Sequence, residues 1–332
     1  MSDPVDQLEE AGRTLSRARD EIAKRIVGQS DVVELVMIAI LSGGHGLLVG
    51  VPGLAKTRLV ETLGTVLGLG TNRIQFTPDL MPADILGSEV LEESEHGGGR
   101  VFKFIKGPIF TQLLLADEIN RASPRTQSAL LQAMQEKVVT VAGETRPLDA
   151  PFHVLATQNP IEQEGTYPLP EAQLDRFLLQ IDMDYPTRDE ERDILLTTTG
   201  VEEAVASPVL DGASLIALQR LVRAMPVGEA VIEAIISLVR AARPGEPDGA
   251  AIATERLAFG PGPRAAQSLM LAARARALLQ GRLAPSLDDV RALAKPALVH
   301  RMALTFAARA EGASLEDVIA GLVDTLSLER AA

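Results

Sequence analysis

The sequence predicts an α/β fold, a parallel sheet flanked by helices, with an all-α domain following it. Residues 45–57 join an apolar run, a glycine-rich turn and a helix start, the arrangement of a phosphate-binding loop. Two later apolar runs, residues 112–116 and 153–159, end in polar side chains, as strands of a parallel sheet do where ligands collect. After Pro186 the chain is rich in alanine and leucine, which indicates a helical domain.

Composition limits the classes of function. The 332 residues suffice for about two domains. The chain contains no cysteine, which excludes thiolate chemistry, and its four histidines show no metal-ligand spacing. The formal charge of −13 argues against broad binding to nucleic-acid phosphates. A polar N-terminus and the lack of a long apolar run predict a cytoplasmic protein without signal peptide or membrane helix.

The N-terminal part predicts two helices that lead into the glycine-rich turn. Residues 5–25 carry one apolar stripe, and we expect it to pack on its own domain rather than on a neighbouring subunit. Ser30 is the expected N-cap of an apolar helix that ends at Gly43. The residues between these helices precede the turn closely, so we expect them to line an adenine pocket.

The glycine-rich turn is the predicted site of nucleotide binding. Gly50 and Gly53 allow several N–H groups to surround an anion, Lys56 reaches the terminal phosphates and Thr57 contacts Mg²⁺. Ala55 replaces the usual glycine, and we expect a negative φ there, which tolerates a methyl group. The residues assigned to nucleotide binding are Ile26, Val27, Gly28, Gly50, Val51, Pro52, Gly53, Leu54, Ala55, Lys56, Thr57 and Arg58.

Two adjacent acids follow the strand predicted at residues 112–116. Asp117 can hold Mg²⁺ through its water shell, and Glu118 can orient and deprotonate an attacking water. The pair alone is a weak signal, because a strand can end in solvated acids. Together with the phosphate loop it favours nucleotide hydrolysis, with Thr57 and Asp117 as the metal residues.

Two further polar residues are candidates for the same chemistry. Asn159 ends the next predicted strand, where its amide can contact the γ-phosphate and the attacking water, or merely cap the turn before Pro160. Arg176 can stabilise charge on a transferring phosphoryl group or form only a surface ion pair.

Two segments interrupt the predicted α/β pattern. After a short strand at residues 73–76, residues 80–110 contain an acidic, glycine-rich tip, predicted to be mobile, and a returning strand at 102–105. Ser123 as N-cap and Pro124 at the first helical position predict that a helix begins there. Residues 137–152 predict a hairpin that turns at Gly143 and Glu144 and returns over residues 147–152.

The C-terminal region predicts six helices, at residues 190–198, 215–225, 229–242, 264–280, 287–294 and 315–328. Ser286 with Asp289, and Ser314 with Asp317, predict capping boxes. Residues 241–252 are rich in glycine and proline and predict a flexible linker.

Four motifs in order resemble the MoxR family of AAA+ ATPases over nearly the whole chain. They are Gly-Val-Pro-Gly-Leu-Ala-Lys-Thr at 50–57, Ala-Asp-Glu-Ile-Asn-Arg at 116–121, Ala-Thr-Gln-Asn-Pro at 156–160 and Leu-Pro-Glu-Ala-Gln-Leu-Asp-Arg-Phe at 169–177. The resemblance implies a P-loop AAA+ core over residues 29–185, preceded by an N-terminal helix at 1–28 and followed by a helical lid at 186–332. It also implies a helix-2 insert at 80–110 and a hairpin before sensor 1 at 137–152, both facing a pore or substrate.

The resemblance also assigns roles. It implies that Lys56 and Thr57 bind ATP and Mg²⁺, that Asp117 and Glu118 are the Walker B pair, and that Asn159 is sensor 1. Arg176 falls on the arginine finger, which acts in the neighbouring subunit, with Arg121 and Arg125 as rivals. Arg264 falls on the sensor 2 arginine, although Pro261 and Gly262 depart from the family pattern, and the residues alone favour a surface position.

The function implied by the resemblance is ATP hydrolysis in an oligomeric ring, expected to be a hexamer, and this hydrolysis is coupled to chaperone-like remodelling of a client protein complex. By the resemblance, the partner is a protein with a von Willebrand factor A domain, and the work is cofactor or metal insertion into an enzyme complex. A motor on nucleic acid is the alternative. The hairpin at 137–152 offers it only two basic residues, Lys137 and Arg146, against the acidic Glu136, Glu144 and Asp149, which is a poor surface for binding phosphates. A scaffold that barely hydrolyses ATP would not need Glu118 and Arg176.

Overall fold

A five-stranded parallel sheet forms the centre of the first domain in the computed structural model, which describes residues 4–93, 100–162, 165–199 and 204–328. The strand order is β2-β5-β8-β1-β9. The strands are β1 (Gly46–Gly50), β2 (Thr71–Gln75), β5 (Leu113–Asp117), β8 (His153–Gln158) and β9 (Leu179–Met183). All neighbouring pairs are parallel, which confirms the predicted fold class. β9 has no counterpart among the predicted strands.

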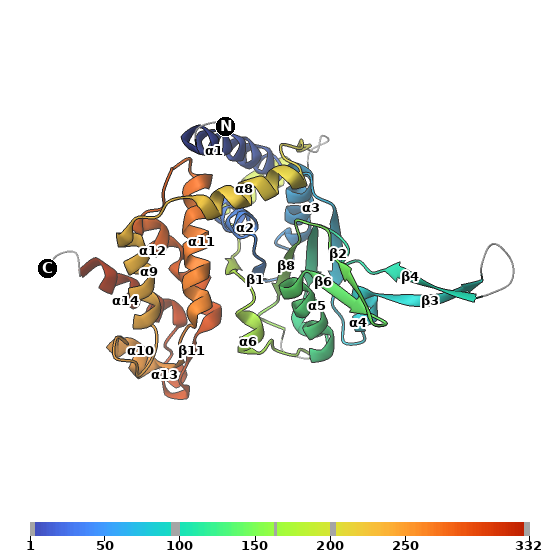
Figure 1. Cartoon of the computed structure of the whole chain (residues 1–332). Coiled ribbons are helices and arrows are strands. Elements are labelled where there is room, and N and C mark those ends of the chain that lie inside the picture. The colour runs from blue at the N-terminus through green and yellow to red at the C-terminus, as the bar shows by residue number, and fades with distance from the viewer. Residues whose placement is uncertain (1–3, 94–99, 163–164, 200–203, 329–332) are drawn as a thin grey trace.

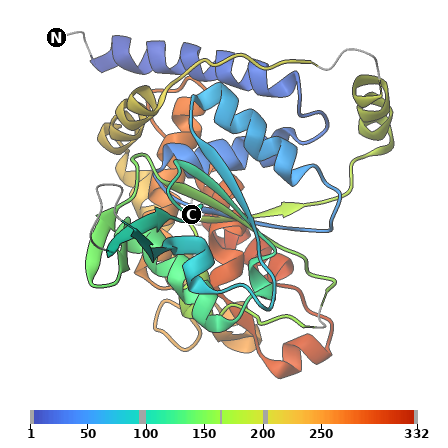
Figure 2. The same cartoon turned by 90° about the vertical axis from the view of Figure 1, so that its right-hand side faces the viewer.

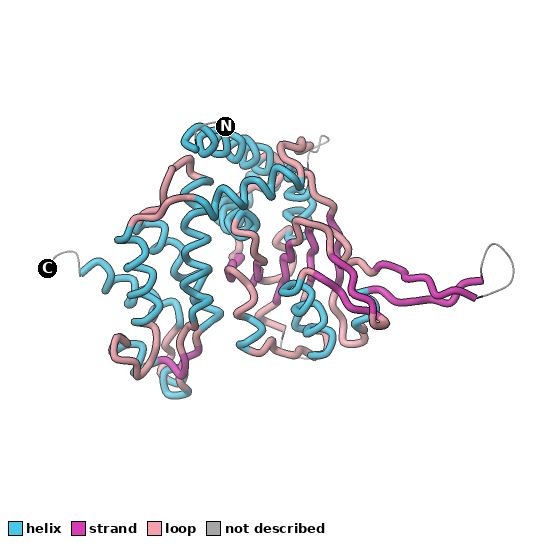
Figure 3. Tube along the Cα trace, viewed as in Figure 1, coloured by secondary structure: helices cyan, strands magenta, loops and turns pink. Residues whose placement is uncertain are grey.

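Helices cover both faces of this sheet (Figure 1, Figure 3). They are α2 (Ser30–Leu41), α3 (Lys56–Leu67), α4 (Pro82–Leu86), α5 (Pro124–Glu136) and α6 (Glu171–Leu174), with a short 3₁₀ helix, η1 (Ile119–Arg121). Neighbouring strand residues point to opposite faces, so Leu48 belongs to the core cluster with α2 and α3, and Leu47 to the cluster with α5. The inner strands β1, β5 and β8 are therefore buried on both faces, and their C-terminal ends are left for polar groups, whereas the edge strand β2 buries only Ile74.

The helix α1 (Pro4–Ala23) packs within its own chain, as the sequence favoured. Its apolar stripe is buried at Leu8, Ala11, Leu15, Ala18 and Ile22. The helix contacts α3 of the sheet domain and α11 (Pro263–Leu279) of the helical domain, and Figure 2 shows it running along one side of the molecule. The stripe is thus used inside the chain. The next helix differs in detail, because its N-cap is Gln29 and not Ser30.

Two antiparallel hairpins leave the sheet domain. The first pairs β3 (Gly87–Glu93) with β4 (Arg100–Lys106) and projects far from the body (Figure 1); most of its predicted mobile tip lies outside the described residues. The second pairs β6 (Val138–Val141) with β7 (Glu144–Pro147). Its turn is at Ala142 and Gly143, both with positive φ, so the predicted turn position and the predicted return strand at 147–152 are wrong. A two-residue turn with both residues in the left-handed conformation, as at Ala142 and Gly143, matches the twist of the two strands that it joins.

The C-terminal region is helical, as predicted, and lies beside the sheet domain (Figure 1). Its helices are α7 (Arg188–Thr198), α8 (Gly212–Ala224), α9 (Glu229–Ala241), α10 (Ala251–Arg256), α11, α12 (Leu287–Leu298), η2 (Val299–Arg301), α13 (Phe306–Ala310) and α14 (Leu315–Leu328). A small ladder of β10 (Leu257–Phe259) and β11 (Ala303–Leu304) was not predicted. The predicted flexible linker at residues 241–252 is instead a closed turn, in which the Ala250 N–H donates to the Ala241 carbonyl at 2.9 Å.

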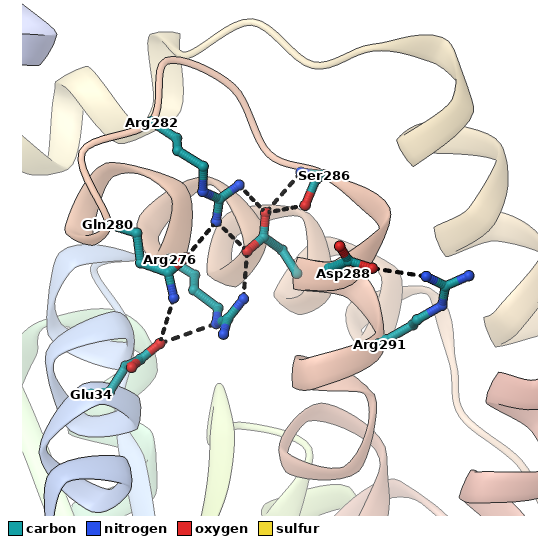
Figure 4. A network of polar contacts seen from close by, with 8 residues as sticks. Glu34, Arg276, Gln280, Arg282, Ser286, Asp288 and Arg291 are labelled. Atoms are coloured by element: carbon teal, nitrogen blue, oxygen red, sulfur yellow. Dashed lines mark hydrogen bonds and ion pairs between the residues drawn. The ribbon is translucent and has the colours of Figure 1, made fainter.

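A buried acid network joins the two domains (Figure 4). Asp289, which is fully buried, accepts hydrogen bonds from Arg276 at 2.7 Å and from Arg282 at 2.6 and 2.7 Å. Arg276 also donates to Glu34 of α2 at 3.0 Å. Burial alone would raise the pKa of Asp289, but hydrogen bonds from Arg282, the Ser286 N–H and Arg276 outweigh it and lower the pKa. The predicted capping box at Ser286 is therefore confirmed and forms part of the domain contact.

Replacing Asp289 by alanine is expected to lower the free energy of unfolding by about 3 kcal/mol, because removing one partner of a buried ion pair leaves the other uncompensated. Urea unfolding at neutral pH measures this. Asp288→Ala is the matched control: Asp288 is the neighbouring residue, its side chain is 82% exposed and it pairs with Arg291, so we expect a loss below about 1 kcal/mol. Equal losses in both variants would contradict the role of the network.

Candidate active site

The phosphate loop connects β1 to α3. Gly50 ends β1 against β9, and a Cβ there would lie 2.5 Å from the Met183 carbonyl oxygen, so only glycine fits. Lys56 begins α3 and its Nζ donates to the Gly50 carbonyl at 2.6 Å, which folds the ammonium group back over the loop. Ala55 has a φ of +54°, so the expected negative φ is wrong. A left-handed conformation at this position explains why glycine is usual there.

The two acids lie at the end of β5 and are fixed from β8. The Thr157 hydroxyl donates to Asp117 Oδ1 at 2.7 Å and accepts the Glu118 N–H at 2.8 Å. Glu118 has a φ of +57°, so the backbone leaves the extended conformation directly after Asp117. The Glu118 side chain therefore does not follow the alternation of the strand. Glu118 Oε2 accepts hydrogen bonds from Gln75 at 2.8 Å and from Arg121 at 3.2 Å. Both acids are therefore held in place by neighbours from other elements.

The loop, the acids and the amide share one cavity of about 470 Å³. Its lining residues are Pro52, Gly53, Ala55, Lys56, Thr57, Arg58, Arg73, Gln75, Asp117, Glu118, Thr157 and Asn159. Burial lowers the pKa of Lys56, and the negative charges of Asp117 and Glu118 oppose that shift. The cavity thus combines a cation that reaches phosphate oxygens with two acids, the groups that metal-assisted phosphoryl transfer requires.

Asn159 lies at the cavity wall and also caps a turn. Its Oδ1 accepts the Ile161 N–H at 3.1 Å, and its Nδ2 is 3.5 Å from Glu162. Both interpretations of Asn159 therefore remain compatible with its position, and its contact with phosphate stays a prediction.

The segment predicted to line the adenine pocket is attached to the phosphate loop. The Gln29 side chain donates to the Leu54 carbonyl at 3.1 Å. Gly28, with a φ of +73°, packs against the Glu190 side chain of α7, where a Cβ would lie 2.7 Å away. Gly50 and Val51 line a neighbouring cavity of about 400 Å³. Ile26, Val27 and Gly28 are thus placed beside the loop, but their contact with a base stays a prediction.

The residues present fit a hydrated Mg²⁺. Thr57 and Asp117 supply hard oxygen donors within the same cavity as Lys56. Among the described residues no group of three or more His, Cys, Asp or Glu side chains could hold a metal by itself. Magnesium in phosphoryl-transfer sites is typically held by one or two protein oxygens and the substrate phosphates, so this donor set suits it.

Two of the predicted site residues lie elsewhere. Arg176 and Arg264 line a second cavity, of about 450 Å³, which shares no lining residue with the first. Arg264 is 3.4 Å from Asp175, whose other oxygen accepts from the buried Arg301 at 2.7 Å. Arg223 also lines this cavity. The cavity therefore holds four arginines and one aspartate, a positive region on an acidic chain.

The rivals of Arg176 have other surroundings. Arg121 is engaged within its own chain by Glu118 at 3.2 Å and by Glu162 at 3.4 Å. Arg125 is exposed at the start of α5 and lines neither cavity. Arg176 is thus the candidate that the structure places together with Arg264.

Sequence reasoning missed three residues of the phosphate cavity: Arg73, Gln75 and Thr157. The signal for the first two is present, because Arg73 and Gln75 flank a buried Ile74 and so face the same side of a strand. Nothing in the sequence shows that β2 lies next to β5, so their proximity to the acids could not be read from the pattern.

Comparisons with known proteins agree with this geometry. Residues 45–179 match the model of the ATPase family associated with various cellular activities, and residues 249–322 match the AAA lid domain. The chain is 44% identical to chaperone MoxR1 of Mycobacterium tuberculosis over 95% of this chain and 82% of that protein. The chain belongs to the MoxR family of AAA+ ATPases. The resemblance seen in the four motifs is confirmed.

Further relatives support the same family. Protein MoxR of Methylorubrum extorquens is 35% identical over 87% of each chain. A crystal structure of a Cytophaga hutchinsonii protein has a TM-score of 0.88 at 37% identity and covers 96% of both chains. In this MoxR-family chain, none of the helices within the described ranges is long and apolar enough to cross a membrane. The family membership supports ATPase activity and does not favour the nucleic-acid motor.

Proposed function

We propose that this chain is a Mg²⁺-dependent ATPase that hydrolyses ATP at a site shared between subunits of a ring and uses the energy to remodel a client protein. The observation that carries the proposal is the single cavity shared by Lys56, Thr57, Asp117, Glu118 and Asn159. In the proposed mechanism Lys56 holds the terminal phosphates, Glu118 takes the proton of the attacking water and Asn159 orients that water. Mg²⁺ held by Thr57 and Asp117 would neutralise charge on the phosphates.

We place Arg176 and Arg264 in the site of the neighbouring subunit. Their cavity is separate from the phosphate cavity of the same chain. Within the described part of the chain, no hydrogen bond or ion pair engages the Arg176 side chain, which leaves its guanidinium available to a phosphate. A fixed guanidinium stabilises the charge that develops on the transferring group. Because Arg264 begins α11 of the helical domain, a γ-phosphate bound there would couple that domain to the state of the nucleotide.

The client-directed part of the proposal rests on the β3–β4 hairpin. Phe102 is 73% exposed on it, and Leu91 and Ile105 are exposed as well. Exposed apolar side chains on a projecting hairpin suit contact with another protein.

We assign the ring as a hexamer, with a von Willebrand factor A domain protein as partner and maturation of a cofactor or metal enzyme as the outcome. The hairpin of β6 and β7 offers little to nucleic acid, since Arg146 pairs with Glu144 at 2.7 Å.

Replacing Lys56 by alanine tests the proposal. Loss of a charge-assisted contact to phosphate is expected to weaken ATP binding about tenfold to a hundredfold, measured by titration with a fluorescent ATP analogue in the presence of Mg²⁺. Lys24→Ala is the control, because Lys24 is an exposed lysine that follows α1 directly and pairs with Glu21 of that helix. Wild-type protein that neither retains ATP nor releases phosphate would refute the ATPase assignment.

A further inference from the structure

An arginine of the edge strand β2 covers one of the two acids in the phosphate cavity. Arg73 donates to Asp117 Oδ2 from Nη2 at 2.6 Å and from Nε at 3.2 Å. The other oxygen of Asp117 accepts from Thr157 at 2.7 Å. Both carboxylate oxygens of Asp117, the residue proposed to hold Mg²⁺, therefore accept hydrogen bonds from side chains of the same protein chain.

The same arginine is linked to the second acid. Arg73 Nη2 also donates to Gln75 Oε1 at 2.8 Å, and Gln75 Nε2 donates to Glu118 Oε2 at 2.8 Å. Arg73 and Gln75 lie two residues apart on β2 and so face the same side of the sheet. Gln75 pairs in register with Asp117 of β5. The strand β2 thus presents one guanidinium and one amide to the two acids.

We propose that Arg73 is a built-in counter-ion of Asp117, which holds this acid while no divalent cation is bound and must leave it before the cation can bind. This inference rests on the proposed function of the cavity. A guanidinium and a hydrated dication compete for the same carboxylate oxygen, because both are attracted by its negative charge. Arg73 therefore lowers the affinity of the site for the cation by the free energy of its own ion pair.

The surroundings of Arg73 allow this exchange. The Arg73 side chain is 49% exposed, whereas that of Asp117 is 15% exposed, so Arg73 can turn into solvent without unpacking the core. When it turns away, Gln75 loses the donor that fixes its carbonyl oxygen. The restraint on Glu118 is then weakened at the moment when the cation arrives. Cation binding at Asp117 and release of the general base Glu118 are thereby connected through one side chain.

Replacing Arg73 by glutamine tests the proposal with Mn²⁺ as the probe. We expect Mn²⁺ to bind about three- to tenfold more tightly to the Arg73→Gln protein saturated with ADP, because a partly exposed ion pair no longer has to be broken. Free Mn²⁺ is measured by its electron paramagnetic resonance signal. Arg73→Met, a second neutral variant, should behave alike. Arg73→Lys keeps the charge but offers one nitrogen in place of the two that contact Asp117, so its Mn²⁺ affinity should lie between wild type and the neutral variants.

The control separates a local effect from a change in net charge. Arg13→Gln removes the same charge from an exposed pair with Glu10 on α1 and should leave Mn²⁺ affinity unchanged. Unchanged or weaker Mn²⁺ binding in both neutral Arg73 variants would overturn the proposal. ADP retention, measured in the same samples, distinguishes this from a wider failure: wild-type protein that does not retain ADP refutes the proposed function, whereas retained ADP with equal Mn²⁺ affinities refutes only the role of Arg73.

Discussion

Glu118→Gln protein is expected to bind ATP with nearly wild-type affinity and to hydrolyse it about 10²- to 10⁴-fold more slowly, the range for loss of a general base. Glutamine keeps the size of the side chain and can still accept from Gln75 and Arg121, which contact Glu118 at 2.8 and 3.2 Å. The local geometry should therefore persist while the proton acceptor is lost. Single-turnover phosphate release and ATP titration measure the two quantities separately.

Glu162→Gln is the matched control for this prediction. It makes the same chemical change at another partner of Arg121, 3.4 Å away, but Glu162 does not line the phosphate cavity. We expect its rate to fall less than about tenfold. Normal turnover in the Glu118→Gln protein would remove Glu118 from the mechanism. If the prediction holds, this protein retains ATP and is the form with which to capture the client.

The parts of the site that the sequence predicted are those encoded locally. Lys56 and Thr57 follow the loop glycines at fixed spacing, so one helix turn fixes their direction relative to the loop. Asp117 and Glu118 follow an apolar run, and the end of a buried strand is where polar residues must appear. These four residues could therefore be assigned to one cavity without coordinates, and the structure places them in it.

The parts that it did not predict depend on contacts distant along the chain. Thr157 reaches Asp117 only because β8 lies beside β5. The strands β10 and β11 are short and pair across more than forty residues, so periodicity alone does not reveal them. The φ of Ala55 is likewise imposed by the turn between β1 and α3, since an isolated alanine prefers negative φ.

Arg176→Ala protein is expected to lose about 10³-fold or more in the rate of ATP hydrolysis, the effect typical of removing an arginine finger, with little change in ATP binding. The reason is that Arg176 lies outside the cavity that holds the phosphates in its own chain and would meet only the nucleotide of the next subunit. Arg125→Ala is the control, because Arg125 is exposed and lines neither cavity; its rate should change less than about tenfold.

Mixing variants decides whether Arg176 acts across the interface. In a ring of Arg176→Ala and Lys56→Ala subunits, a site with an intact Lys56 can face a neighbour with an intact Arg176, and random equal mixing makes about a quarter of the sites complete. Activity should therefore return. Mixing Lys56→Ala with Glu118→Gln subunits should restore nothing, because both changes lie in one cavity and every site keeps one of them. Recovery in neither mixture would place Arg176 in the site of its own chain.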